Sequence, residues 1–353
     1  MNVLLIGLGR WGEKHVRVLR ELGVDLWVAD VSADRRAWAA ERGVAPAQAV
    51  ADFRDALEVV DAVSIVTPAD SHTAIAEISL AAGRHCFIEK PLAMTVAEGR
   101  ALAAAADEAG CVLQVGHIFR FHPVTAALRD ALSKQRVGAV RFATGRFAGF
   151  KRPRTDVGVT HTDAIHYFDL FAYLFGQPAT SVIAVQHDHL GRGLDDLSVT
   201  AVRYGEVTAI VEADYFVPGT HRQCVIVGDR GALVADYGAG TVAFHPGEHV
   251  KLDGVWDVMG GAPESVTVTG DEPLRVELAA FLNACAGHGS SLVNAADGVH
   301  ALEIVEAAAL SARARREVSL SEISEGSRRP PPKPPPSSGL RRRSRRSERR
   351  KGR

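Results

Sequence analysis

Short apolar runs alternate with amphipathic segments over the first 120 residues of the chain. The runs have the length of buried strands, and the segments between them repeat their apolar positions at helical spacing. Strand–helix alternation of this kind predicts a doubly wound parallel sheet in an α/β domain. The predicted strands span residues 3–8, 24–29, 62–67, 85–88 and 112–115, and the predicted helices span 13–22, 33–42, 71–82 and 96–109.

The pattern changes after residue 120. Helical periodicity at 124–132 and 161–175 flanks a strand at 139–147, and alternating strands with glycine turns then fill 180–268. This order predicts a C-terminal α+β domain with a large, mainly antiparallel open sheet. The strands predicted most clearly are 197–204, 208–215, 224–227 and 317–320, and the closing helices are 274–286 and 295–312.

Charge is distributed unevenly along the chain. Of 41 Lys and Arg and 42 Asp and Glu in total, residues 328–353 hold 12 basic residues and one acid. The remainder, with 29 basic and 41 acidic residues, is acidic, which argues against nucleic-acid binding by the folded body. The Arg- and Pro-rich end has no apolar face to bury. We therefore predict domains at 1–120 and 121–325 and a disordered basic tail at 326–353, whose partner is left open.

Composition narrows the class of protein further. The 353 residues are 46% hydrophobic and include no run of 18 apolar residues, so no membrane span is expected. The chain opens on a strand without a basic leader, so no signal peptide is expected. The four cysteines form no CxxC pair, which fits free thiols in a reducing, cytoplasmic location.

A glycine motif follows the first predicted strand and precedes the first predicted helix. Gly7, Gly9 and Gly12 form G-x-G-x-x-G, with Arg10 and Trp11 before the last glycine. The first glycine permits a tight turn, the second lets the backbone approach a pyrophosphate, and the third lets the helix pack on the strand. In this context the motif predicts a dinucleotide-binding Rossmann domain.

The second predicted strand ends at an acid, Asp30, 18 residues after Gly12. A carboxylate there accepts hydrogen bonds from the adenine ribose and repels a 2′-phosphate, so the expected cofactor is NAD. Arg35 and Arg36 follow closely and would favour NADP if they folded back, so NADP stays possible.

Two further strand ends carry polar residues. The carboxyl ends of parallel strands face the crevice in which an open α/β sheet binds its ligand. A lysine buried beside a glutamate at such an end would have a lowered pKa and could relay protons. The residues are Thr67, Pro68 and His72 at one end, and Glu89, Lys90 and Pro91 at the other.

Five motifs occur in the order typical of one enzyme family. Together they resemble the glucose–fructose oxidoreductase/inositol dehydrogenase/rhizopine-catabolism (Gfo/Idh/MocA) oxidoreductases over residues 1 to about 322. The motifs are the glycine loop, Thr67-Pro68 with His72, Glu89-Lys90-Pro91, Val115-Gly116-His117 before Arg120-Phe121, and His166-Tyr167-Phe168-Asp169 before Leu174-Phe175-Gly176.

The resemblance implies a nicotinamide-dependent dehydrogenase acting on a sugar, a polyol or a nucleotide-sugar. Its catalytic lysine corresponds to Lys90 and its catalytic histidine to His166. His166 would take the hydroxyl proton while Lys90 stabilises the oxygen as it becomes a carbonyl. The resemblance also places His117 and Arg120 at the substrate.

The chain departs from the family beside the catalytic histidine. Many members carry an aspartate four residues before it, where this chain has Thr162. Asp163, three residues before His166, is one candidate to take over the acid's role. His161 is a second candidate base, and the sequence leaves this choice open.

The substrate class rests on a basic loop, Lys151-Arg152-Pro153-Arg154. The loop resembles UDP-N-acetylhexosamine 3-dehydrogenases of the family, in which Arg152 and Arg154 would bind a nucleotide-sugar diphosphate. If the cations face solvent instead, a free polyol or sugar dehydrogenase such as inositol 2-dehydrogenase is favoured. A non-catalytic NAD-binding regulator is the third alternative, against which the presence of Lys90 and His166 argues.

Two last features concern assembly and metals. Val199, Ala201 and Ile210 are apolar on the face of the second sheet that the helices should leave open, which predicts a homodimer or homotetramer. His187-Asp188-His189 could offer metal ligands, but the sequence shows no further ligand to complete a metal site. We therefore expect a solvated turn and no metal.

Overall fold

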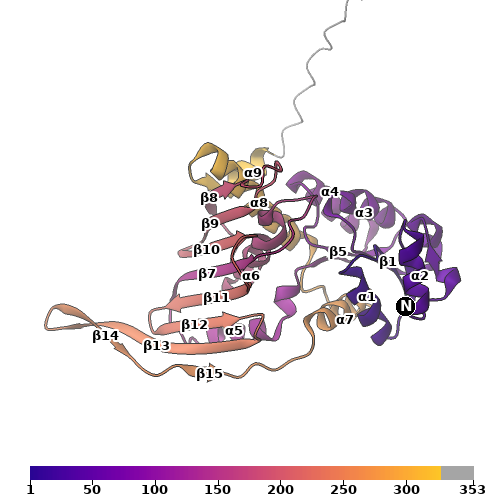
Figure 1. Cartoon of the computed structure of the whole chain (residues 1–353). Helices are drawn as coiled ribbons and strands as arrows, with labels where there is room; N and C mark the ends of the chain where they lie inside the picture. Colours follow the sequence, from indigo (N-terminus) through magenta and orange to yellow (C-terminus); the bar gives the residue numbers. More distant parts are fainter. Residues whose placement is uncertain (327–353) are drawn as a thin grey trace, which may run out of the picture.

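The computed structural model describes residues 1–326, so the predicted tail beyond residue 326 lies outside the described part. Two lobes lie side by side, each built on one sheet (Figure 1). No helix within residues 1–326 has the length and apolar character needed to cross a bilayer.

The first lobe contains a six-stranded parallel sheet in the order β3-β2-β1-β4-β5-β6, as the strand–helix alternation predicts. The first predicted strand stops early, at Ile6, because Gly7 turns the chain with a φ of +95°. The sequence misses only the two-residue edge strand β3. The strands are β1 (Asn2–Ile6), β2 (Asp25–Ala29), β3 (Ala49–Val50), β4 (Ala62–Ile65), β5 (His85–Glu89) and β6 (Leu113–Gly116).

Helices cover both faces of this sheet. Val3 and Leu5 of β1 face α1, α2 and α7, whereas Leu4 and Ile6 face the side of α3 and α4. Helix α7 lies far along the chain and is predicted with the second domain, yet its Phe281 packs on Phe87 of β5, with ring centroids 5.7 Å apart. The helices are α1 (Gly12–Glu21), α2 (Ala33–Glu41), α3 (His72–Ala81), α4 (Val96–Ala109) and α7 (Pro273–Cys285), with short helices η1 (Pro46–Gln48), η2 (Phe53–Val59) and η3 (Ala69–Ser71).

The second lobe is a ten-stranded sheet in the order β14-β13-β12-β11-β7-β10-β9-β8-β16, with β15 added on β13. Only β7 and β10 pair in parallel, so the sheet is mainly antiparallel, as predicted. The strands are β7 (Val140–Gly149), β8 (Ser181–His187), β9 (Leu197–Tyr204), β10 (Val207–Asp214), β11 (Thr220–Gly228), β12 (Gly231–Asp236), β13 (Thr241–Leu252), β14 (Val255–Gly260), β15 (Glu264–Val266) and β16 (Val318–Ser319).

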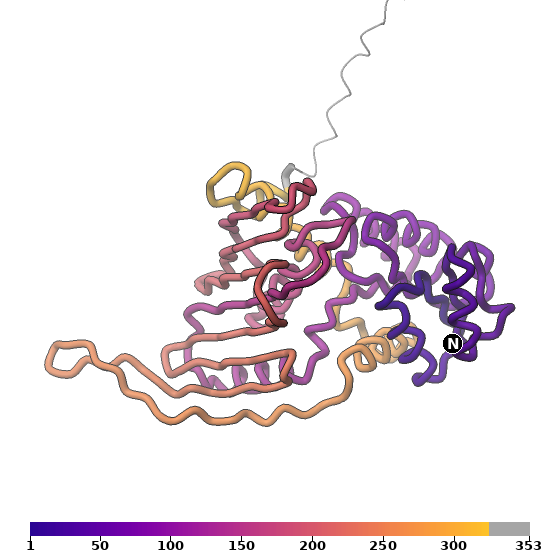
Figure 2. Tube along the Cα trace, in the orientation of Figure 1, coloured from indigo at the N-terminus to yellow at the C-terminus, as the bar shows by residue number. Residues whose placement is uncertain are grey.

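Helices cover one face of this second sheet and leave the other open (Figure 1). The β13–β14 hairpin projects beyond the body of the lobe, as the trace in Figure 2 shows. The helices are η4 (Ile118–Phe121), α5 (Pro123–Ser133), the π-helical turn η5 (Thr160–Ala164), α6 (Ile165–Phe175), α8 (Ala295–Ala314) and α9 (Leu320–Gly326).

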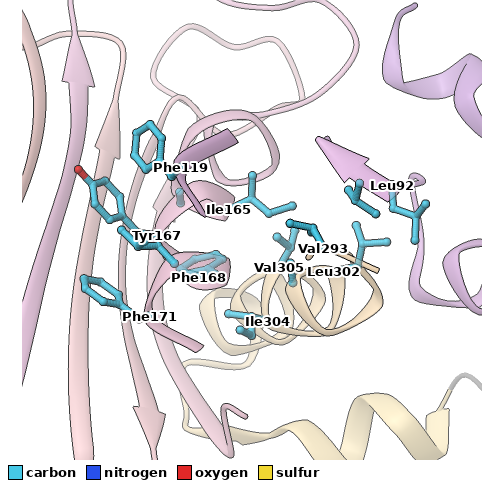
Figure 3. Close-up of a cluster of buried hydrophobic side chains, with 14 of the residues drawn as sticks. Leu92, Phe119, Ile165, Tyr167, Phe168, Phe171, Val293, Leu302, Ile304 and Val305 are labelled. Carbon is cyan, nitrogen blue, oxygen red and sulfur yellow. The ribbon is translucent and has the colours of Figure 1, made fainter. Parts of the chain in front are cut away.

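The lobes meet along α8, which packs against both α4 and α6. Gly99 of α4 allows α8 to come close, because a Cβ there would lie 3.1 Å from Leu302. Gly298 of α8 allows the contact with β6, because a Cβ there would lie 2.7 Å from Val115. Phe168 and Leu302 belong to the continuous apolar core at this junction (Figure 3).

A buried ion cluster crosses the same junction. The Arg120 guanidinium in η4 donates to the Asp169 carboxylate of α6 at 2.6 and 2.9 Å. It also pairs with Asp297 of α8 at 2.9 Å and donates to the Leu292 carbonyl at 3.1 Å. These contacts join η4, α6 and α8 at one charged group.

Candidate active site

The glycine loop has the shape that a dinucleotide requires. A Cβ on Gly7 would lie 2.6 Å from the Val66 carbonyl oxygen, and one on Gly12 would lie 2.1 Å from the Gly7 carbonyl oxygen. Gly9 has nothing within 4 Å of the place a Cβ would take, so its backbone borders open space. This open position at the start of α1 fits a pyrophosphate.

Asp30 ends β2 beside this loop. Its carboxylate accepts hydrogen bonds from the backbone of Leu8 at 2.8 Å and Ser32 at 2.9 Å. Arg35 and Arg36 fold back, but both guanidinium groups are engaged by the protein itself. Arg35 donates to the Leu8 carbonyl and pairs with Glu13, both at 2.6 Å, and Arg36 donates to the Asp30 carbonyl at 2.7 Å. Each Asp30 oxygen keeps a free lone pair for a ribose hydroxyl.

One cavity of about 270 Å³ brings the loop and the predicted chemistry together. It joins the carboxyl ends of β4 and β5 to α6 of the second lobe. Lys90 and His166, the predicted catalytic pair, both line it. The other lining residues are Trp11, Val66, Thr67, Glu89, Ile118 and Arg154.

Lys90 links the two lobes at this cavity. Its Nζ atom donates a hydrogen bond of 2.5 Å to the carbonyl oxygen of Thr162 in η5. Burial lowers the pKa of the Lys90 ammonium to about 8, while the charges of Asp163 and Glu89 oppose the shift. Lys90 is thus mostly protonated at pH 7 and loses its proton as the pH rises through about 8.

His166 stands between two aromatic rings. Its ring centroid lies 4.7 Å from that of Phe119 and 5.1 Å from that of Phe147, and both rings are stacked on it. Burial lowers the pKa of His166 well below its ordinary value, and the nearby charge of Lys90 lowers it further. The imidazole is therefore neutral at pH 7 and able to accept a proton.

The π-helical turn η5 carries all three candidates for the family's missing acid, His161, Thr162 and Asp163. The Asp163 carboxylate is buried and pairs with Lys151 at 2.6 Å. The Thr162 hydroxyl contacts the Tyr215 hydroxyl at 3.0 Å instead. His161 does not line the cavity. Of the three candidates, Asp163 is the one whose charge acts on Lys90.

Glu89 is hydrogen-bonded to the glycine loop. Its carboxylate accepts from the Trp11 indole at 2.6 Å and contacts His15 at 3.2 Å, and His15 in turn contacts the Ser64 hydroxyl at 3.2 Å. Sequence reasoning misses His15 and Ser64. Both are polar groups within buried faces of α1 and β4, and only their shared contact reveals them.

Several predicted contact residues do not reach the cavity. His72 is buried and contacts the carbonyl oxygens of Pro91 at 2.8 Å and Thr67 at 3.0 Å, so it ties two strand ends together. His117 is 1% exposed, and Arg120 is held in the ion cluster. His72 thus links two strand ends and Arg120 belongs to the ion cluster, while the charge of His117 acts on His166. Arg10, Pro68 and Arg152 also lie outside the residues that line the cavity.

A glycine loop on a doubly wound sheet, with a lysine and a neutral histidine in one cavity, defines a nucleotide-dependent dehydrogenase site. The family comparisons agree. Residues 1–117 match the model of an oxidoreductase family with an NAD-binding Rossmann fold, and residues 134–320 match its C-terminal alpha/beta domain. The chain belongs to this Gfo/Idh/MocA oxidoreductase family.

Individual relatives are sugar and polyol dehydrogenases. The chain is 32% identical to UDP-N-acetylglucosamine 3-dehydrogenase of Acidithiobacillus ferrooxidans, over 91% of this chain and 98% of the relative. It is 26% identical to inositol 2-dehydrogenase of Rhizobium meliloti, over 90% and 98%. A solved structure of the Acidithiobacillus enzyme matches with a TM-score of 0.76 at 27% identity, covering 89% of this chain and 98% of that one. The protein is an NAD-dependent oxidoreductase acting on CH–OH groups, which removes the alternative of a non-catalytic regulator.

Replacing Asp30 by Asn tests whether this carboxylate favours NAD over NADP. The change removes the negative charge and keeps one acceptor oxygen for the backbone. Loss of a carboxylate–phosphate repulsion of ~1–2 kcal/mol should raise the ratio of NADP to NAD catalytic efficiency about tenfold. The ratio of kcat/KM values for the two cofactors measures this. An unchanged ratio in a variant with wild-type thermal stability would show that Asp30 does not select the cofactor.

Proposed function

We propose that the protein oxidises a ring hydroxyl of a UDP-N-acetylhexosamine, at C3, with NAD as hydride acceptor. The observation that carries the proposal is the shared cavity, in which Lys90 and His166 meet Trp11 of the glycine loop and Arg154 of the basic loop. The similarity to UDP-N-acetylglucosamine 3-dehydrogenase over nearly the whole chain supports the substrate class.

In the proposed mechanism the two residues act on one oxygen. Neutral His166 accepts the hydroxyl proton, and the Lys90 ammonium donates a hydrogen bond to the oxygen as its negative charge develops. Bound nicotinamide supplies the hydride acceptor. Phe119 and Phe147 hold the imidazole plane, and Thr162 holds Lys90 through its carbonyl oxygen.

Asp163 takes the role of the family acid in this proposal. It carries a buried negative charge near Lys90 and favours the protonated ammonium. Because it pairs with Lys151, it also fixes the basic loop against the turn that carries the Thr162 carbonyl. His161 and Thr162 then have no proton-transfer role.

The second candidate function is the oxidation of a free polyol, as in inositol 2-dehydrogenase. The exposed position of Arg152 favours it, because this cation of the basic loop faces solvent, and Arg154 is the arginine of that loop that lines the cavity. Turnover of UDP-N-acetylglucosamine, myo-inositol and N-acetylglucosamine, followed by NADH absorbance, separates the two functions.

We also propose a cytoplasmic homo-oligomer. All four cysteines are unpaired, as expected in a reducing compartment. Ile183, Val199 and Ile210 are 51%, 41% and 43% exposed on the open face of the second sheet. An antiparallel sheet facing water is normally polar, so a second copy of the chain is the expected cover for this face.

Charge placed on the open face should separate the copies. The double variant Val199→Asp and Ile210→Asp puts four carboxylates into each two-fold contact, and desolvating them is costly. Light scattering at micromolar concentration should show a dimer or tetramer for the wild type and a smaller species for the variant. Val59→Asp, at a site 47% exposed in the first lobe, is the matched control and should keep the wild-type mass. A monomeric wild type would contradict the assembly.

Removing either member of the catalytic pair should leave cofactor binding intact. Lys90→Ala and His166→Ala should each lower kcat by ~10²–10⁴, the usual effect of a positioned acid–base group. The double variant should lose less than the product of the two factors, because both act on one oxygen. Single-turnover kinetics measure the chemical step, and NADH fluorescence titration measures cofactor affinity. Near wild-type turnover by Lys90→Ala would overturn the mechanism.

The pH profile should follow Lys90 on its alkaline side. The charged ammonium is lost as pH rises through about 8, so kcat/KM for oxidation should fall above that value. Because the pKa of His166 is lowered, its neutral form persists below pH 6.5, and the acid limb should lie there. In Lys90→Arg the guanidinium stays charged, so the alkaline limb should disappear even at reduced activity. An unchanged alkaline limb in that variant would assign it to another group.

A further inference from the structure

The turn between β8 and β9 holds one arginine in a defined place. The Asp188 carboxylate accepts hydrogen bonds from the backbone of Arg192 at 2.9 Å and of Gly193 at 2.6 Å. Gly191 and Gly193 have left-handed φ values of +67° and +74° on either side of Arg192. The Asp188 carboxylate of the His187-Asp188-His189 segment therefore shapes this turn.

The same β8–β9 loop packs against the π-helical turn η5. The Asp195 carboxylate accepts from both the backbone and the hydroxyl of Thr160, at 2.8 and 2.6 Å. The Val159 backbone donates to the Asp195 carbonyl at 2.8 Å. A Cβ on Gly158 would lie 1.7 Å from the Asp195 carboxylate, so glycine is needed for this contact. The position of Arg192 is thus coupled to the π-helical turn whose carbonyl holds Lys90.

The guanidinium of Arg192 is only partly satisfied. One terminal nitrogen, Nη1, donates to the Arg154 carbonyl at 2.5 Å. The Nε and Nη2 atoms are buried and have no hydrogen-bond partner among residues 1–326. A buried charged donor without a partner is costly, which marks a place where a ligand acceptor would be bound.

Arg192 is part of a larger positive surface, the cationic wall, made of Lys151, Arg154, Arg192 and Arg222. Two aromatic rings lie beneath these cations. The Arg192 guanidinium lies 5.9 Å from the ring centroid of Tyr215, and the Arg222 guanidinium lies 3.3 Å from that of Phe147. The Lys151 ammonium lies near both rings. The parallel pairing of β7 and β10 places these two rings at neighbouring strand ends.

Charge on the wall is only half compensated. Lys151 pairs with Asp163, and Arg154 pairs with Asp156. Arg192 and Arg222 have no carboxylate within ion-pair distance in the described part of the chain, and Arg222 donates instead to the carbonyls of Ala148 and His221 at 2.9 and 2.6 Å. Two guanidinium charges remain. Arg192 contacts the backbone of Arg154, which lines the cavity, and the charge of Arg222 acts on His166 in the same cavity.

We propose that Arg192, which sequence reasoning misses, binds an anionic group of the substrate and that Arg222 supplies the second charge of this site. The inference rests on the proposed function, in which the anion is the diphosphate of the nucleotide-sugar. A planar guanidinium with two free donors matches phosphate oxygens or a carboxylate in a bidentate contact. A carboxylate on the sugar is the other source of the same chemistry.

Arginine variants and two anionic probes test the site. Arg192→Ala should raise KM for UDP-N-acetylglucosamine about 10- to 100-fold, with kcat changed less than about threefold, because a charged hydrogen bond to the ground state is lost. The inhibition constant of UDP should rise by the same factor. Arg192→Lys should recover part of the loss. Arg313→Ala, which removes an exposed arginine from the last turn of α8, is the matched control and should behave as the wild type.

The outcomes separate the inference from the proposed function. Weaker inhibition by UDP in Arg192→Ala supports a diphosphate, whereas weaker inhibition by glucuronate alone assigns the anion to a sugar carboxylate and removes the nucleotide-sugar proposal. Unchanged constants for both probes overturn the inference, and turnover of UDP-N-acetylglucosamine would then still support the proposed function. Thermal denaturation and NADH titration report folding. If Arg192→Ala does not fold, Arg192→Gln replaces it in the same inhibition assays. The salt dependence of UDP inhibition is then also measured for the wild type. Inhibition that does not depend on salt would overturn the inference.

Discussion

One buried guanidinium, that of Arg120, holds the junction on which the active site depends. It pairs with the buried Asp169 in α6 and with the partly exposed Asp297 at the start of α8. Loss of Arg120 would leave the Asp169 carboxylate buried without its compensating cation, which is costly. His166 lies on α6 and its stacking partner Phe119 lies in η4. The ion cluster therefore joins the two elements that carry the stacked pair of Phe119 and His166, the proposed base.

Burial lowers the pKa of both proposed catalytic groups, Lys90 and His166, but the charges around the two groups differ in sign. Burial removes the proton from His166, and neighbouring cations strengthen that effect. Burial also weakens the ammonium of Lys90, but Asp163 and Glu89 oppose the shift and leave the pKa at about 8. The pair thus holds a neutral base and a mostly protonated donor in one cavity. The two groups differ because the carboxylates of Asp163 and Glu89 act on Lys90, whereas the charges that act on His166 are cations.

The parts of the molecule that could be predicted from sequence are those encoded by local patterns. Strand–helix alternation identifies the first sheet, and the glycine loop with Asp30 follows from spacing along the chain, as does the strand end at Lys90. The sequence could not show which sheet α7 covers, because the apolar spacing of a helix does not name the surface that it packs against. Only the structure shows that Phe281 of α7 packs on Phe87 of the first sheet. His72, His117 and Arg120 are polar residues in family motifs, and the motif does not say that burial turns them inward.

The π-helical turn shows why the second half of the site needs the structure. A turn that takes one extra residue changes which side chain faces the cavity, and no sequence period signals it. Here it directs the Thr162 carbonyl to Lys90 and the Asp163 carboxylate to Lys151, so the acid that we propose in place of the family's lies three residues before His166. The same turn receives the β8–β9 loop through Thr160, which brings Arg192 to the Arg154 backbone from a distant part of the sequence. A single irregular turn thus connects Lys90, the proposed partner of the reacting oxygen, with Arg154 and Arg192, the cations that we propose for the rest of the substrate.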